Sequence, residues 1–189
     1  MESRMNESID VSFPNMGWSK YAFLSLFGGI KGINIIPPTP VNSSMVEIGV
    51  KLSPEFVCFP FKVTMGELIH LIEKKKVNTL IFAIDKGPCR MGFYAHVQQK
   101  IMRDYGVDFR MITLQQDSLY PETDWLKPFA EFEKLTGRRI SKFRIFTNII
   151  RFLFKAKYIE ELTQYSCIIR CREINKGDTN RTVNRLLKM

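Results

Sequence analysis

Hydrophobic and polar positions along the first 118 residues follow two alternating periods. Short apolar runs predict β-strands at Ile9–Phe13, Ile33–Ile36, Thr79–Ile84 and Phe109–Leu114. Apolar residues spaced three and four positions apart predict helices at Trp18–Phe27, 42–52, 60–74 and 92–105. Strands that alternate with helices at this spacing are typical of βαβ crossovers. We therefore expect an α/β fold: an open parallel sheet, Rossmann or flavodoxin-like, with helices on both faces.

The pattern changes from Asp124 onward, where apolar and basic residues are mixed. Helices are predicted at Trp125–Leu135, Phe143–Leu162 and Thr179–Leu187. We expect residues 1–120 to form the α/β domain and residues 121–189 to form a helical C-terminal extension. That extension is expected to pack on the domain or on a partner.

The composition is that of an ordinary globular protein. The chain has 189 residues, of which 45% are hydrophobic and 25% charged, and its 15 Phe residues can fill a core. No apolar stretch is long enough to cross a bilayer, and the first ten residues lack the pattern of a signal peptide. We therefore expect a cytoplasmic protein that does not use a membrane.

The formal net charge of +9 comes entirely from the C-terminal quarter. Residues 1–136 contain 15 basic and 15 acidic residues, whereas residues 137–189 contain 13 basic and 4 acidic residues. Such a segment can bind nucleic acid or an acidic partner, or form a solvated helical face. No nucleic-acid recognition motif accompanies the charge, so nucleic acid is the weakest of these interpretations.

Two of the four cysteines lie where a cofactor could bind. Cys58 ends the short apolar segment Phe56–Phe59, and Cys89 follows the strand Thr79–Ile84; a helix is predicted to begin just after each. The partial positive charge of a helix N-terminus favours a thiolate, which is the ligand form for zinc and iron–sulfur clusters. If the two preceding strands are neighbours, the two thiols share one crevice at the carboxyl edge of the sheet. The alternative for Cys58 is a plain core residue.

Other chemistry has little support in the sequence. The segments Gly28-Gly29 and Gly87–Gly92 match neither GxGxxG nor a P-loop, so no ATP motif is present. The only two histidines, His70 and His96, fall inside predicted helices, where packing or surface roles are commoner than catalytic ones. No catalytic residue is assigned.

Several strings in this chain resemble one protein family. FPNMGWSKYAF, PEFVCFPFK, GPCRMGFY and REINKGDTNR are similar to the N-terminal half of CoA protein activase-related proteins. These are also described as 2-hydroxyglutaryl-CoA dehydratase D-component-like proteins, of the 2-hydroxyacyl-CoA dehydratase and benzoyl-CoA reductase superfamily. The resemblance runs from about residue 9 to the C-terminus, and PEFVCFPFK with GPCRMGFY is its most specific part.

The resemblance implies a metal centre. Subunits of this superfamily bind [4Fe–4S] clusters in α/β domains, with two cysteine ligands from the first half of the subunit and a third from the second half. The matching positions here are Cys58 and Cys89, with Gly87, Pro88, Arg90 and Gly92 shaping the loop. Glycines at positions 87 and 92 can let backbone approach a cofactor closely.

The role expected from the resemblance is electron transfer or enzyme assembly, as a lyase or reductase component that does not catalyse alone. The third ligand is expected from a polypeptide resembling the second half, or from a homodimer. The alternative function is a cofactor-free interaction subunit that docks a partner through the basic and apolar C-terminal helices.

Overall fold

A computed structural model describes residues 8–85, 89–116 and 126–187. Its internal contacts divide the chain into two units. The first, called the α/β unit below, comprises Met1–Asn15 and Gly29–Ser141; the second, called the helical unit, comprises Met16–Gly28 and Lys142–Met189.

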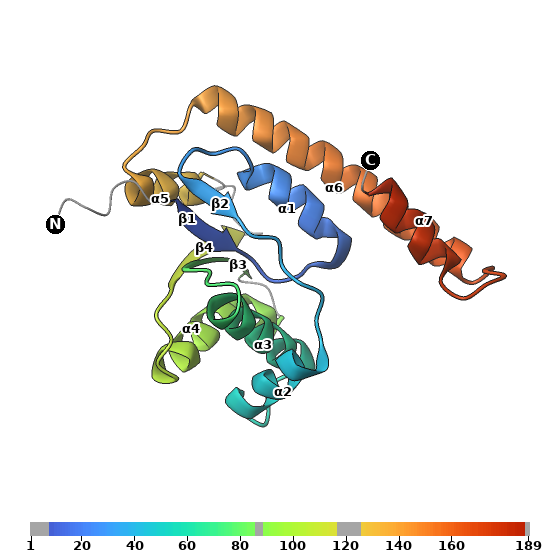
Figure 1. Cartoon of the computed structure of the whole chain (residues 1–189), viewed down its shortest axis with the longest axis horizontal. Helices are drawn as coiled ribbons and strands as arrows, with labels where there is room; N and C mark the ends of the chain where they lie inside the picture. The colour runs from blue at the N-terminus through green and yellow to red at the C-terminus, as the bar shows by residue number, and fades with distance from the viewer. Residues whose placement is uncertain (1–7, 86–88, 117–125, 188–189) are drawn as a thin grey trace. The chain divides into compact units, whose positions relative to one another are not determined.

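Four parallel strands form the sheet of the α/β unit (Figure 1). Their bounds in chain order are β1 Ile9–Ser12, β2 Ile33–Ile35, β3 Thr79–Asp85 and β4 Arg110–Gln116. The order across the sheet is β2-β1-β3-β4, which is the order of the flavodoxin-like fold up to its fourth strand. The predicted open parallel α/β fold is therefore confirmed.

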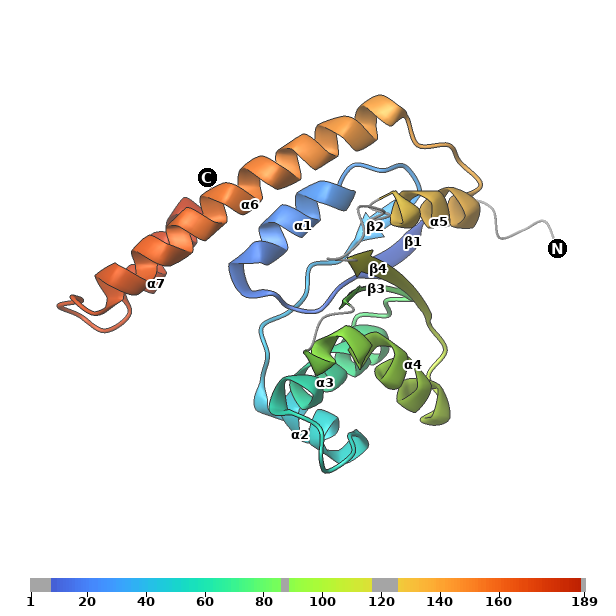
Figure 2. The ribbon, with the colours of Figure 1, turned by 180° about the vertical axis from the view of Figure 1, so that it is seen from behind.

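The helices of the α/β unit lie on both sides of the sheet. They are α2 Ser43–Leu52, α3 Phe59–Glu73, the 3₁₀ segment η2 Arg90–Phe93, α4 Tyr94–Asp104 and α5 Lys127–Thr136. Helices α3 and α4 cover one face, and α5 lies on the opposite side (Figures 1 and 2). Buried side chains of α3, β3 and α4 form the main core, including Met65, Leu68, Leu80, Phe82 and Met102.

Local signals in the sequence explain where two of these helices begin. Asn42 precedes α2, and its side-chain Oδ1 accepts a hydrogen bond of 3.0 Å from the backbone N–H of Met45. This satisfies one of the N–H groups that a helix N-terminus leaves without a partner. Pro60 stands in the first turn of α3, where its missing N–H costs nothing.

Helix α2 packs against α3 through two glycines. A Cβ atom built on Gly49 would lie 1.8 Å from the backbone oxygen of Lys62, and one built on Gly66 would lie 1.7 Å from that of Met45. Neither position tolerates a side chain without moving a backbone. The pair therefore sets the close approach of α2 to α3.

The helical unit consists of η1 Gly17–Ser19, α1 Lys20–Phe27, α6 Lys142–Arg170 and α7 Asp178–Leu186. The rings of Phe23 on α1 and Phe152 on α6 meet edge to face with centroids 5.2 Å apart. The Asn148 side chain on α6 donates from Nδ2 to the backbone oxygens of Leu26, at 2.9 Å, and Gly28, at 3.0 Å. These carbonyls at the C-terminal end of α1 would otherwise lack partners.

The contact-based division differs from the predicted boundary at residue 120 in two ways. Helix α1 groups with the C-terminal helices because Phe23, Leu26 and Gly28 contact α6, whereas α5 groups with the sheet. Helix α6 also runs eight residues beyond the predicted end at Leu162. Over the part of the chain that the structure covers, no helix combines the length and apolar character needed to span a bilayer.

Candidate functional site

Cys58 is the N-cap residue of α3, at an exposed position. The segment before it forms a turn, with Phe56 92% exposed, so it is not a strand. The turn begins at Pro54, whose backbone oxygen accepts a hydrogen bond of 3.5 Å from the N–H of Val57. The alternative reading of Cys58 as a core residue is wrong, because its thiol is free and accessible.

Cys89 is the N-cap residue of η2, which continues directly into α4, and it is also exposed. Cys89 follows β3, whereas β2 is the strand that precedes Cys58 along the chain. Because β1 lies between β2 and β3, these two strands are not neighbours, and the condition stated for a shared crevice at adjacent strands is not met. Cys58 precedes α3, and Cys89 precedes η2 and α4. Helices α3 and α4 cover the same face of the sheet and begin at the same edge of it.

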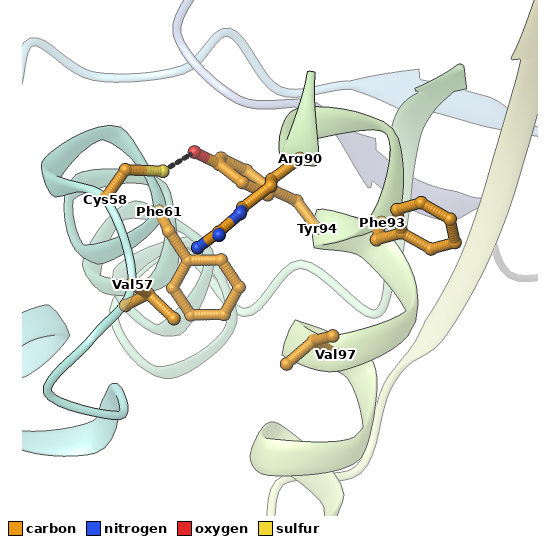
Figure 3. Close-up of a pocket in the computed structure, with 7 residues that line it drawn as sticks. All are labelled: Val57, Cys58, Phe61, Arg90, Phe93, Tyr94 and Val97. Carbon is orange, nitrogen blue, oxygen red and sulfur yellow. Dashed lines mark hydrogen bonds between the residues drawn. The ribbon is translucent and has the colours of Figure 1, made fainter. Parts of the chain in front are cut away.

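Tyr94 lies in the first turn of α4, five residues after Cys89, and its side chain contacts Cys58. Its hydroxyl forms a short hydrogen bond with Sγ of Cys58, although 36 residues separate them in sequence (Figure 3). The Tyr94 ring is 6% exposed and meets the Phe61 ring edge to face, with centroids 5.0 Å apart. A buried, packed ring fixes where its hydroxyl emerges. The Cys58 sulfur is therefore held at a defined point beside α4.

A second contact ties α3 to α4 one turn further along. Gln98 is fully buried, and its Nε2 donates to the backbone oxygen of Phe61, at 3.0 Å, and to Oγ1 of Thr64, at 2.7 Å. Gln98 lies four residues after Tyr94 and thus on the same face of α4. Together the two side chains lock the first turns of the two helices to each other.

A mostly apolar cavity of about 190 Å³ opens beside the Cys58 thiol (Figure 3). Its lining is formed by Val57, Cys58, Phe61, Arg90, Phe93, Tyr94 and Val97. The Arg90 side chain extends toward the Cys58 side of this space. Arg90, the residue after Cys89, therefore adds a positive charge to the mostly apolar lining of the cavity beside Cys58.

The electrostatic setting favours a thiolate at Cys58. The hydrogen bond from the Tyr94 hydroxyl lowers the pKa of the Cys58 thiol below its ordinary value, with a smaller contribution from the positive charge of Arg90. Burial and the interaction with Cys58 raise the pKa of Tyr94 to about 12, and the negative charge of Cys89 acts in the same direction. Tyr94 therefore stays protonated as a donor, and both thiols lie within electrostatic reach of its hydroxyl.

The four residues predicted to shape the loop around Cys89 do not all lie at the cavity. Arg90 lines the cavity, while Gly92 is buried within η2 and does not line it. Gly87 and Pro88 lie outside the residues that the structure describes. Cys167 and Cys171 are exposed near the end of α6, in the helical unit. Within the described ranges, no group of three His, Cys, Asp or Glu side chains is placed to hold a metal ion.

Sequence reasoning missed Tyr94 and Gln98. Tyr94 is the last residue of the string GPCRMGFY and lies five residues after Cys89. Its place in the same string as Cys89 was the signal that could have singled it out. Gln98 is polar on a helix face whose other members are apolar, a pattern that indicates a buried hydrogen bond.

Comparisons with protein-family models, with curated proteins and with solved structures found no match to this chain.

The donor set fits part of a soft-metal site. Two accessible thiols stand at helix N-termini, one with its pKa lowered, and thiolates are the usual ligands of iron–sulfur clusters. Backbone N–H groups at these helix starts can donate to sulfur and adjust the properties of a bound centre. Among the described residues, no third His, Cys, Asp or Glu side chain joins these two thiols in a group that could hold a metal ion.

Proposed function

We propose that this chain is a cytoplasmic iron–sulfur-binding component related to the 2-hydroxyacyl-CoA dehydratase system. The observation that carries the proposal is the pair of exposed thiols, Cys58 and Cys89, at the starts of two helices on one face of a parallel sheet. The similarity of PEFVCFPFK and GPCRMGFY to CoA protein activase-related proteins supports the same two residues.

The chain's own residues would bind and orient the cofactor. Cys58 and Cys89 would ligate iron, and Tyr94 and Arg90 would favour the thiolate form of Cys58. Phe61, Phe93 and Val97 would limit the access of water on one side. A bound [4Fe–4S] cluster would supply one-electron transfer to a lyase or reductase partner.

The ligands that the described residues do not supply would come from a second polypeptide. In the superfamily that the sequence resembles, the third cysteine lies in the second half of the subunit, so a polypeptide similar to that half is the proposed partner. A homodimer is the competing arrangement, because two-fold symmetry would bring four cysteines from identical surfaces.

Anaerobic reconstitution with iron and sulfide tests the proposal. We expect brown protein whose iron is lost in both C58A and C89A, while a C167A/C171A variant keeps it, because only the first pair forms the site. About four irons per dimer of the isolated chain would establish the homodimer. Iron uptake that requires an added polypeptide similar to the second half would establish the two-component site. Absence of iron under both conditions contradicts the cluster.

A second function, a cofactor-free interaction subunit, is supported by the exposed face of α6. Phe143, Phe146 and Phe154 are 75%, 61% and 62% exposed, and residues 142–158 contain five basic and no acidic side chains. Apolar patches of this kind mark contact sites, and the charge favours an acidic protein surface over a second copy of the chain. Colourless protein with four free thiols after reconstitution would favour this function.

A further inference from the structure

Tyr94 occupies a place that packing alone does not explain. Its ring is buried against Phe61, but its hydroxyl reaches the exposed edge of α3 and bonds a cysteine there. A phenylalanine would fill the same ring volume without that bond. The hydroxyl therefore makes a contact that the packing of the ring does not require.

We propose that Tyr94 is a positioning residue whose hydroxyl holds the Cys58 sulfur toward Cys89 at the start of η2. The inference rests on the proposed function, since it concerns how the same two thiols are brought together. It goes beyond that function because it names a third residue, Tyr94, that sets the position of the two thiols without being a ligand itself.

Three contacts make Tyr94 suited to this role. The Tyr94 ring packs against Phe61. Phe61 lies in the first turn of α3, and Cys58 is the N-cap residue of the same helix. Gln98 anchors the same face of α4 to the backbone of Phe61, so the start of α4 cannot shift along α3 independently. The hydroxyl then fixes one rotamer of Cys58, whose side chain at an exposed N-cap position would otherwise rotate freely.

The second thiol is connected to the same point. Cys89 precedes η2, and η2 leads without interruption into Tyr94. Arg90, the residue that follows Cys89, lines the cavity beside Cys58. Tyr94 is therefore hydrogen-bonded to Cys58 and lies five residues after Cys89 along the chain.

A short bifunctional thiol reagent, dibromobimane, measures this geometry without any metal. The background variant is C167S/C171S, which leaves Cys58 and Cys89 as the only thiols. The reaction is run at a pH of about 9.5, where free thiols are largely ionised, so the rate of the second, ring-closing alkylation reports proximity rather than ionisation.

We expect Y94F to slow the closure of the crosslink at least about fivefold relative to the background variant. The matched control is Y105F, which removes the hydroxyl of a tyrosine that follows the last residue of α4 and is 51% exposed. It should crosslink at the background rate. Circular dichroism and cooperative unfolding of Y94F establish that a slower rate does not come from a misfolded chain.

The outcomes separate this inference from the proposed function. Closure in Y94F at the background rate overturns the positioning role, and so does a background variant that forms no crosslink. Slow closure in Y94F alone supports it, whether or not reconstituted protein takes up iron. Where the crosslink depends on Tyr94 but iron is never bound, the cluster proposal fails and the positioning of Cys58 stands.

Co²⁺ uptake provides a second measurement that a purely structural role would not change. Thiolate ligation of Co²⁺ gives a charge-transfer absorbance that depends on the sulfur geometry. We expect a shifted or weaker band in Y94F, with Y105F unchanged. Identical spectra in Y94F and Y105F would contradict the role of the hydroxyl.

Discussion

The α/β unit and the helical unit use their apolar residues in opposite ways. Helix α3, with 15 residues, buries seven of them, among them Met65, Leu68 and Ile69. Helix α6, with 29 residues, buries only Asn148, Ile159 and Ser166, and two of these are polar. Large side chains such as Phe143 and Leu153 remain mostly exposed on α6.

The difference shows that hydrophobic content does not by itself predict where a core forms. Both helices are rich in apolar residues, but α3 lies between the sheet and α2, whereas α6 has α1 and α7 as its neighbours within its unit. Within the helical unit, the two Asn148 hydrogen bonds to the end of α1 and the Phe23–Phe152 ring contact join α6 to α1.

A matched pair of leucine truncations gives the largest expected effect. L80A removes a fully buried side chain in β3 and should lower the free energy of unfolding by about 2–5 kcal/mol, because it leaves a cavity. L153A removes a side chain that is 55% exposed on α6 and should change it by less than about 0.5 kcal/mol. Denaturant unfolding followed by circular dichroism measures both. An equal loss in L153A would show that the α6 face is covered in solution.

The second prediction concerns the change of the free energy of unfolding with pH, which we expect to depend on the buried Glu67 in the α/β unit. This side chain is 4% exposed, its Oε1 has no hydrogen-bond partner among the described residues, and burial raises its pKa from 4.5 to about 7. Below pH 4.5 the folded and unfolded states both carry the proton. As pH rises toward 7 the unfolded state ionises first, so folding loses stability, by up to about 3 kcal/mol at pH 8.

The substitution E67Q should remove that pH dependence, since a neutral amide does not ionise. The free energy of unfolding, measured from pH 5 to pH 8, should then change less with pH than it does in the original chain. E73Q, at an exposed position of the same helix, is the control and should keep the original slope. A slope that persists in E67Q would place the responsible group elsewhere.

The smallest effect concerns the helical unit. N148A removes two hydrogen bonds and leaves the carbonyls of Leu26 and Gly28 without donors, which should cost about 1–3 kcal/mol. Hydrogen exchange resolved by residue should show reduced protection in α1 while β3 is unaffected. Q164A, at an exposed position of α6, is the control. Lost protection in β3 would mean that the two units unfold together.

The fold was largely predictable from local patterns. The run Thr79–Ile84 was identified as a buried strand because it is apolar throughout, and it forms most of β3. The positions of Cys58 and Cys89 before helix starts were also predicted correctly, since Pro60 and the change of period mark those starts. The apolar segment Phe56–Phe59 was open to either structure, because four apolar residues fit a strand or a turn equally well.

The sequence by itself determined the elements, their type and the placement of two thiols at helix N-termini. Only the tertiary structure decided that Tyr94 meets Cys58 and that Asn148 caps α1, across separations of 36 and about 120 residues. Periodicity and capping act over a few residues, so they are readable in one chain. Contacts between distant residues depend on the strand order and on which helix faces meet, and neither is encoded in the local pattern.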